Sequence, residues 1–145
     1  MKALQFPNFQ FQIREAEGKL FIYDAFRKKE VVLTPEEWVR QHVLAYLCEV
    51  QNYPSSLIAV ERSLTYNQLK KRFDVLVFGR NGKPFMLVEC KAPEVKLSSE
   101  TLFQIATYNT AFQVPYLFVS NGLQHLLFGL IDGKYQSIQG FPEAQ

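Results

Sequence analysis

The sequence has few of the features that mark secreted, membrane-bound or repetitive proteins. Its two cysteines, Cys48 and Cys90, cannot form a disulfide framework, and both lie in segments that we expect to be buried. No apolar run approaches the roughly 18 residues that a membrane span requires. The N-terminus lacks the apolar stretch of a signal peptide. These absences predict a protein of a reducing compartment, the cytoplasm, with no membrane association.

A strong charge of one sign is also missing. Lys and Arg number 16 against 14 for Asp and Glu, which gives a net charge of +2. This balance permits nucleic-acid binding but is not evidence for it. With 145 residues, 48% of them apolar, the chain is long enough for one globular domain with its own core. We expect a single domain over residues 1–145, with an N-terminal arm at 1–18 and a folded core at 19–140.

The first half of the chain predicts two short strands and a helix. The strands are expected at 19–23 and 30–33. Thr34 suits the N-cap of the helix, Pro35 its first position, and Glu37 the last position of a capping box. An apolar stripe follows at helical spacing, and the helix should end before Asn52. The stripe consists of Val39, Val43, Tyr46, Leu47 and Val50.

The second half predicts mostly strands around a second helix. That helix should start at 98–100 and end near 112. The expected strands lie at 57–64, 72–78, 84–91, 115–120, 124–130 and 135–138, with a connection at 65–70. The resulting order predicts an α/β fold with a mixed central β-sheet flanked by helices.

One predicted hairpin places charged residues among apolar ones. Asn81-Gly82 is a strong signal for a two-residue hairpin loop. With that loop, Asp74 lies opposite Glu89, and Arg72 opposite Lys91. Strand alternation then puts both carboxylates and the lysine on one face. Opposed like charges destabilise a strand pair, and a divalent cation bound by both acids would remove the conflict.

Other interpretations of the charged residues are open at this point. Asp74, Glu89 and Lys91 could form a structural ion-pair network with Lys71 and Arg72. The run Lys70–Arg72 could be a solvated face or could contact phosphates. Glu61 is expected at the surface or behind the site, and His42 and His125 are expected to be structural, since neither has a metal-ligand partner at a useful spacing.

The strand acid and the Glu-x-Lys motif resemble the PD-(D/E)xK nuclease superfamily. Asp74 matches its Asp, and Glu89-Cys90-Lys91 matches its Glu-x-Lys, while Phe73 stands where the pattern has Pro. The resemblance implies a restriction-endonuclease-like core. It also implies that Asp74, Glu89 and the backbone carbonyl of Cys90 bind Mg²⁺, which Mn²⁺ could replace, and that Lys91 assists attack on a phosphodiester.

Further segments extend this resemblance over residues 20–140. Gln104 and Tyr108, four apart on the second helix, resemble the Gln-x-x-x-Tyr of RecB-type members, where the pair supports the active site and nucleic-acid contacts. The segments 34–41, 88–93 and 119–122 are similar to the N-terminal nuclease domain of type I restriction enzyme R subunits, and more closely to small standalone bacterial proteins related to it.

The family usually adds an acid from its first helix, and two residues could supply it. Glu37 already has the capping-box role with Thr34. Glu36 lies three residues before Val39 and seven before Val43, so it heads the inward-facing stripe. We favour Glu36, and Glu37 stays as the alternative because helix boundaries shift easily by a residue.

The resemblance implies a Mg²⁺-dependent endonuclease that acts on DNA. A catalytically weak nucleic-acid-binding or partner-binding module of the same fold is the alternative. R subunits carry a helicase motor after this domain, but these residues contain no Gly-x-x-x-x-Gly-Lys-Ser/Thr motif. We therefore expect that protein partners supply recognition or translocation, that the domain acts on structured DNA, or that it has an unrelated role.

Overall fold

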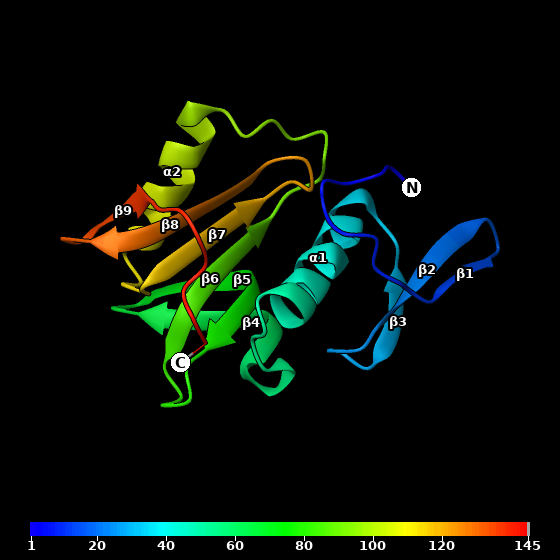
Figure 1. The fold of residues 1–145 in the computed structure, drawn as a ribbon, viewed down its shortest axis with the longest axis horizontal. Helices are drawn as coiled ribbons and strands as arrows, with labels where there is room; N and C mark the ends of the chain where they lie inside the picture. The colour runs from blue at the N-terminus through cyan, green and yellow to red at the C-terminus, as the bar shows by residue number, and fades with distance from the viewer. Residues whose placement is uncertain (145) are drawn as a thin grey trace.

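The computed structural model describes residues 1–144 and contains two β-sheets (Figure 1). The small sheet has three antiparallel strands in chain order. They are β1 (Ile13–Ala16), β2 (Lys19–Asp24) and β3 (Lys29–Val32). The two strands predicted here are confirmed, and the predicted arm at 1–18 contains a third.

The large sheet has six strands, also in chain order. They are β4 (Ile58–Tyr66), β5 (Leu69–Phe78), β6 (Pro84–Cys90), β7 (Tyr116–Ser120), β8 (His125–Ile131) and β9 (Lys134–Ser137). Strands β6 and β7 pair in parallel and the other neighbours are antiparallel. The sheet is therefore mixed, and its one parallel pair lies at the centre, where a helix makes the crossover.

Two α-helices begin where the sequence predicted, and each has a side-chain cap. In α1 (Pro35–Ala45) the Thr34 hydroxyl accepts a hydrogen bond from the amide of Glu37 at 3.1 Å. In α2 (Ser99–Thr110) the Ser98 hydroxyl accepts one from the amide of Thr101 at 3.2 Å. Each cap satisfies an amide that the helix start would leave without a partner. A π-helical turn, η1 (Tyr46–Val50), extends α1, and a 3₁₀ turn, η2 (Ser55–Leu57), precedes β4.

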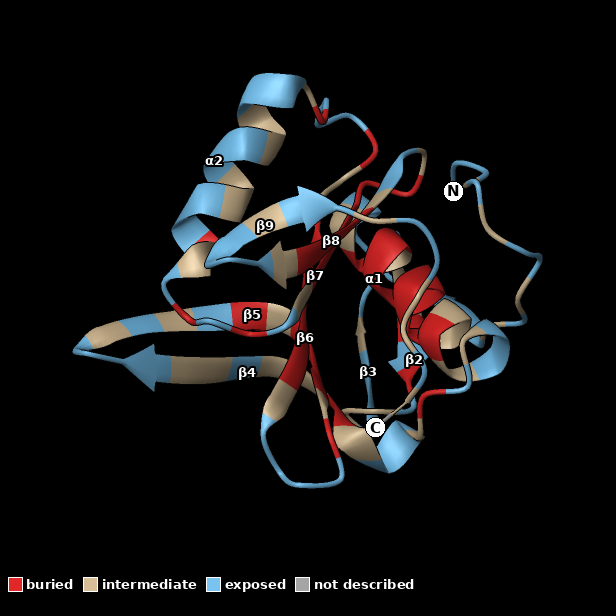
Figure 2. Ribbon diagram, turned by 60° about the vertical axis from the view of Figure 1, so that its left-hand side comes forward, coloured by how far each residue is buried: buried red, intermediate tan, exposed pale blue. Residues whose placement is uncertain are grey.

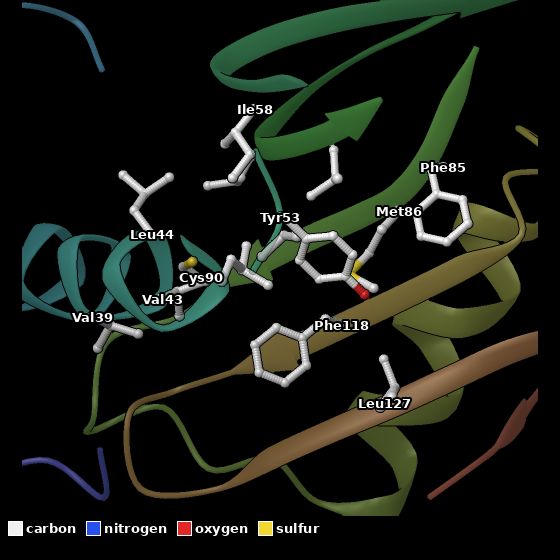
Figure 3. Packing of buried hydrophobic residues seen from close by; sticks show 14 residues of the cluster. Val39, Val43, Leu44, Tyr53, Ile58, Phe85, Met86, Cys90, Phe118 and Leu127 are labelled. Atoms are coloured by element: carbon white, nitrogen blue, oxygen red, sulfur yellow. The ribbon is translucent and has the colours of Figure 1, made fainter. Parts of the chain in front are cut away.

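The helices cover opposite faces of the large sheet, so its central strands are buried on both sides (Figures 1 and 2). From α1, Val39 and Val43 pack into a cluster with Met86, Val88 and Phe118 (Figure 3). On the other face, α2 packs against a second cluster. This cluster is formed by Phe73, Leu76, Leu87, Leu97, Phe112, Val114, Leu117, Val119 and Phe128. The predicted α/β fold with a mixed sheet between helices is confirmed.

The β5–β6 hairpin has the predicted register but a different loop. Val75 pairs with Val88 and Val77 with Met86, as a continuation toward Asp74 and Glu89 requires. The prediction of a two-residue loop at Asn81-Gly82 is wrong, because a bulge between Val77 and Phe78 shifts the register by one residue. The connection instead spans residues 79–83, closed by a hydrogen bond from the Gly79 amide to the Lys83 carbonyl at 2.9 Å.

The predicted connection at 65–70 is also wrong. Strands β4 and β5 continue to Tyr66 and from Leu69, so only two residues join them. Asn67 and Gln68 both have positive φ values, 49° and 69°, as the central residues of a type I′ turn do. Because Gln rarely adopts this conformation, the sequence carried no usual signal for the turn.

The N-terminal segment crosses the end of the large sheet. The Gln5 amide donates a hydrogen bond to the Gly122 carbonyl at 2.8 Å. The centre of the Phe6 ring lies 4.2 Å from the centre of the His125 ring. The two cysteines are free; Cys90 is buried as expected, whereas Cys48 is only half-buried. No helix within residues 1–144 is long and apolar enough to cross a membrane.

Candidate active site

A cavity of about 370 Å³ lies between the β5–β6 hairpin and α2. Four of the predicted site residues line it: Glu89 from the end of β6, Lys91 directly after that strand, and Gln104 and Tyr108 from α2. The remaining lining residues are Lys71, Ile105 and Asn109. The parallel β6–β7 crossover brings α2 over the end of β6, which explains how residues distant in sequence meet here.

A larger hollow of about 780 Å³ lies elsewhere, beside the 79–83 loop and the connection from α2 to β7. Its described lining contains Lys83 but no carboxylate and no histidine. We place the candidate site in the smaller of these two cavities because Glu89 meets Lys71 and Lys91 there, and these groups are suited to metal binding or proton transfer.

Glu89 is the buried acid of the site. Lys71 donates a hydrogen bond from its ammonium to Glu89 Oε1, and a second one to Asn109 Oδ1 at 2.9 Å. Burial raises the pKa of the Glu89 carboxyl; the positive charge of Lys71 opposes this effect, and the negative charge of Asp74 adds to it. The ion pair with Lys71 agrees with the structural-network interpretation.

Asp74 contacts the backbone beside Glu89. Its Oδ2 accepts a hydrogen bond from the amide of Cys90 at 2.8 Å, and its Oδ1 accepts one from Arg40 at 3.1 Å. The Cys90 side chain packs in the cluster on the α1 face, as its alternation with Glu89 predicted. The Asp74 carboxylate thus reaches the middle residue of the Glu-x-Lys motif.

The regular strand alternation from which one charged face was predicted for the hairpin breaks at Asp74. Along β5, Phe73 packs in the cluster on the α2 face, whereas Val75 packs in the cluster on the α1 face, so the alternation changes phase at Asp74. Strand β4 pairs with β5 on both sides of Asp74, through Val60–Val75 and Arg62–Phe73. Glu61, between these pairs, is unpaired and has a left-handed φ of 54°. Consequently Asp74 meets Arg40 of α1, while Glu89 meets residues on the α2 side.

The predicted pairing of Arg72 with Lys91 is wrong as well. Strand β6 ends at Cys90, and the Lys91 amide donates to the Ser120 carbonyl of β7 at 2.9 Å. The Arg72 guanidinium instead donates to Glu61 at 2.7 Å. Lys91 therefore leaves the hairpin and lines the cavity beside Glu89.

The two candidate helix acids have different environments. The Glu36 side chain is 47% exposed, and its carboxylate lies 3.8 Å from Arg40. Burial, followed by the nearby charge of Asp74, raises the pKa of Glu36. Glu37 is buried and accepts hydrogen bonds from Arg27 at 2.7 Å, Arg40 at 2.5 Å and Gln41 at 3.0 Å. Its carboxylate is thus fully used by these partners, while that of Glu36 is more open.

Sequence reasoning missed a network of ion pairs beside the site. Arg27, in the β2–β3 turn, contacts Asp24 at 2.5 Å, Glu61 at 2.6 Å and Glu37 at 2.7 Å. Through Glu37 the network reaches Arg40 and then Asp74. The members come from five separate elements or turns, so no local motif could have indicated it. The network connects the small sheet to the candidate site.

The two histidines have structural hydrogen bonds, as expected. The Nδ1 atom of His42 lies 2.8 Å from the Trp38 carbonyl oxygen. His125 lies 2.8 Å from the Ser120 hydroxyl through Nδ1 and 2.6 Å from the Gln5 carbonyl oxygen through Nε2. Burial lowers the pKa of both imidazoles.

The oxygen donors suit a hard divalent cation. Two carboxylates and a backbone carbonyl are ligands of the type that Mg²⁺ prefers. In residues 1–144 no three His, Cys, Asp or Glu side chains are gathered closely enough to hold a metal by themselves. Asp74 and Glu89 each carry a cationic partner, Arg40 and Lys71, so both carboxylates are compensated by positive charge. The donor chemistry fits Mg²⁺ when Arg40 and Lys71 move away from the two carboxylates.

Comparison with known proteins places the chain in one family. A search of the curated proteins found no match. The fold is similar to that of a fragment of a protein described as an HsdR subunit of a type I restriction enzyme from Vibrio vulnificus, with a TM-score of 0.53 and 21% identity. That match covers 77% of this chain but 24% of the other, so this chain spans about a quarter of that fragment. The family model for the N-terminus of the type I restriction enzyme R protein matches residues 35–142, and the chain belongs to that family.

Proposed function

We propose that this chain is a metal-dependent nuclease domain of the PD-(D/E)xK type that hydrolyses phosphodiester bonds in DNA. One observation carries the proposal. Glu89 and Lys91 line a single cavity with Gln104 and Tyr108, and the Asp74 carboxylate is hydrogen-bonded to the amide of Cys90, between the two motif residues. Membership of the R protein N-terminus family supports DNA as the substrate.

Three groups would hold the cation: the carboxylates of Asp74 and Glu89 and the backbone carbonyl of Cys90. A bound Mg²⁺ supplies positive charge for the phosphate and lowers the pKa of bound water. Glu36 is the additional acid from α1, because its carboxylate lies close enough to Asp74 for that charge to raise its pKa.

The other residues position substrate and water. Lys91 lines the cavity with Glu89, where its ammonium can hydrogen-bond the attacking water or balance charge on the phosphate. Gln104 and Tyr108 project from α2 into the same cavity, with amide and phenol groups that can donate to phosphate oxygens. The Tyr108 side chain is 48% exposed, so a nucleic-acid strand can reach it.

Recognition and translocation are assigned to protein partners. The 145 residues contain no phosphate-binding P-loop motif that could serve a helicase motor. The chain corresponds to about a quarter of the HsdR fragment, and other subunits or domains of a restriction-modification assembly would select the DNA.

A plasmid-nicking assay tests the proposal. Supercoiled plasmid and single-stranded DNA are incubated with the protein in Mg²⁺, in Mn²⁺ and in chelator. We expect cleavage with either cation, none in chelator and none with Glu89→Gln. Glu30→Gln is the matched control, because Glu30 pairs with Arg14 on the exposed small sheet, and its activity should equal that of the wild type. Cleavage that persists in chelator or in Glu89→Gln would reject the nuclease function.

A nucleic-acid-binding module without turnover is the second candidate. The observation that favours it is that Arg40 pairs with Asp74 and Lys71 with Glu89, so side chains of the domain itself compensate both carboxylates. DNA affinity that is equal in Mg²⁺ and chelator, that falls steeply with salt, and that is accompanied by no cleavage would support this candidate over the nuclease.

A further inference from the structure

Lys71 differs from the lysine and arginine on either side of it. Lys70 and Arg72 are exposed, whereas the Lys71 side chain is only 22% exposed and lines the candidate cavity. The strand alternation explains this difference, because Lys71 and Phe73 both face α2 while their neighbours face away. The solvated-run interpretation therefore does not hold for Lys71.

The Lys71 ammonium contacts three residues that line the cavity and one buried aromatic residue, Phe73. It donates to Glu89 and to Asn109, and it lies 5.0 Å from the centre of the Tyr108 ring and 4.8 Å from that of Phe73. Two aromatic faces and a buried carboxylate form an environment that favours a cation. The position next to Glu89 is thus suited both to an ammonium group and to a metal cation.

We propose that Lys71 is a positioning residue that occupies the positive-charge position at Glu89 until a divalent cation binds, and that it then moves toward the phosphate of the substrate. This inference rests on the proposed nuclease function and adds a residue outside the Asp and Glu-x-Lys motif. The oxygen that accepts the ammonium hydrogen bond is one of the lone-pair donors that the cation requires, so the two compete.

The released ammonium has a place to go within the same cavity. Its contacts with Tyr108 and Asn109 come from α2 and do not depend on Glu89. Tyr108 is also a proposed nucleic-acid contact, so an ammonium retained beside its ring lies where a phosphate would pass. The site would therefore exchange an internal cation for a metal without leaving Glu89 uncompensated at any stage.

Calorimetric titration of the full chain with Mn²⁺ tests the inference. Met preserves the apolar stem of Lys71 and removes its charge, so Lys71→Met should lower the Kd for Mn²⁺ by about tenfold, which corresponds to about 1.4 kcal/mol. Lys70→Met is the matched control on the exposed side of the same strand and should bind as the wild type does. An unchanged or higher Kd in Lys71→Met would overturn the inference.

A second measurement uses the wild-type protein and does not depend on how a variant folds. In ¹³C spectra of the lysine side chains, the Cε resonance of Lys71 should shift when Mg²⁺ is added, while that of Lys70 stays in place. An unmoved Lys71 resonance at saturating Mg²⁺ would overturn the inference.

Glu89→Gln separates this inference from the proposed function. If Glu89→Gln abolishes Mn²⁺ binding while Lys71→Met binds like the wild type, the metal site stands and the role of Lys71 is rejected. If Glu89→Gln binds Mn²⁺ as the wild type does, or if neither the wild type nor Lys71→Met binds Mn²⁺, both the site and the inference are rejected.

Discussion

At the scale of single residues, charged side chains beside the cavity are buried and paired. Arg40 is 7% exposed and lies between Glu37 and Asp74, with its Nε atom lacking a hydrogen-bond partner in the described chain. The pKa of Arg40 is raised, because the charges of Glu37 and Asp74 outweigh the opposing effect of burial. Removing one member of such a set leaves buried charge without compensation.

We therefore expect Arg40→Met to lower the free energy of unfolding by about 3 kcal/mol, the usual cost of breaking a buried pair from one side. Urea denaturation at neutral pH measures this change. Arg14→Met is the control, since the Arg14–Glu30 pair lies on the exposed small sheet and its loss should change stability little. Equal losses in the two variants would contradict the importance of the buried network.

Asp24 gives a pH dependence with a definite sign. Burial alone would raise its pKa, but hydrogen bonds from the Arg27 guanidinium and from the Phe26 and Arg27 amides hold the pKa below its ordinary value. A lowered folded-state pKa means that Asp24 stabilises the fold above the unfolded value of about 3.9. This contribution is lost as the pH falls through the lower, folded-state pKa.

We expect Asp24→Asn to be less stable than the wild type at pH 7, and the difference to shrink below about pH 3.9. Denaturation curves from pH 7 to pH 2 measure the difference. Asp132→Asn, in the exposed β8–β9 turn, should instead follow the wild type throughout. A stability difference for Asp24→Asn that stays constant down to pH 2 would show that the negative charge of Asp24 does not stabilise the fold.

At the scale of elements, the turn at Asn121-Gly122 connects the N-terminal segment to α1. Gly122 has a φ of 88°, and a Cβ atom there would lie 2.7 Å from a methyl carbon of Leu4 and 3.1 Å from one of Val39. A side chain at this position would meet both backbone strain and a close contact. The turn therefore requires glycine for two independent reasons.

We expect Gly122→Ala to lower the free energy of unfolding by roughly 2 kcal/mol, from left-handed strain plus displacement of Leu4. Gly133→Ala is the matched variant, because Gly133 has a φ of 78° but no atom within 4 Å of the added Cβ. It should show the strain alone and a smaller loss in chemical denaturation. A loss in Gly133→Ala as large as that in Gly122→Ala would mean that the contact with Leu4 contributes nothing.

The sequence was sufficient for most elements but not for two loops. The cap at Thr34 and the polar residues at 98–100 are local signals, and they predicted where the helices start. The central register was predicted from the Asn81-Gly82 loop, and it holds at Val75–Val88 and Val77–Met86 although the loop differs. The Gly79–Lys83 connection was missed because a bulge, which depends on packing, consumes one residue of the strand. The Asn67-Gln68 turn was missed because its second residue is not one that usually adopts positive φ.

At the scale of the whole molecule, the order of strands and helices along the chain was predictable and the charge network was not. Patterning predicted six strands and a mixed sheet between two helices, whereas the order of the strands within the sheet was not predicted. The contact of Arg40 with Asp74 and that of Lys71 with Glu89 depend on where α1 packs on the sheet. They also depend on the break in side-chain alternation at Asp74 in β5. The sequence therefore identified residues that line the site but not Arg40 as the partner of Asp74.

The proposed function depends on Asp74 and Glu89 binding one divalent cation together with the carbonyl of Cys90. Anomalous diffraction from a crystal soaked in Mn²⁺ tests it without knowledge of the substrate. We expect one peak about 2.1 Å from an oxygen of each carboxylate, with the Lys71 ammonium moved away from Glu89, and no peak in Asp74→Asn. A well-diffracting soaked crystal with no peak between the two carboxylates, or with both ion pairs unchanged, would contradict it.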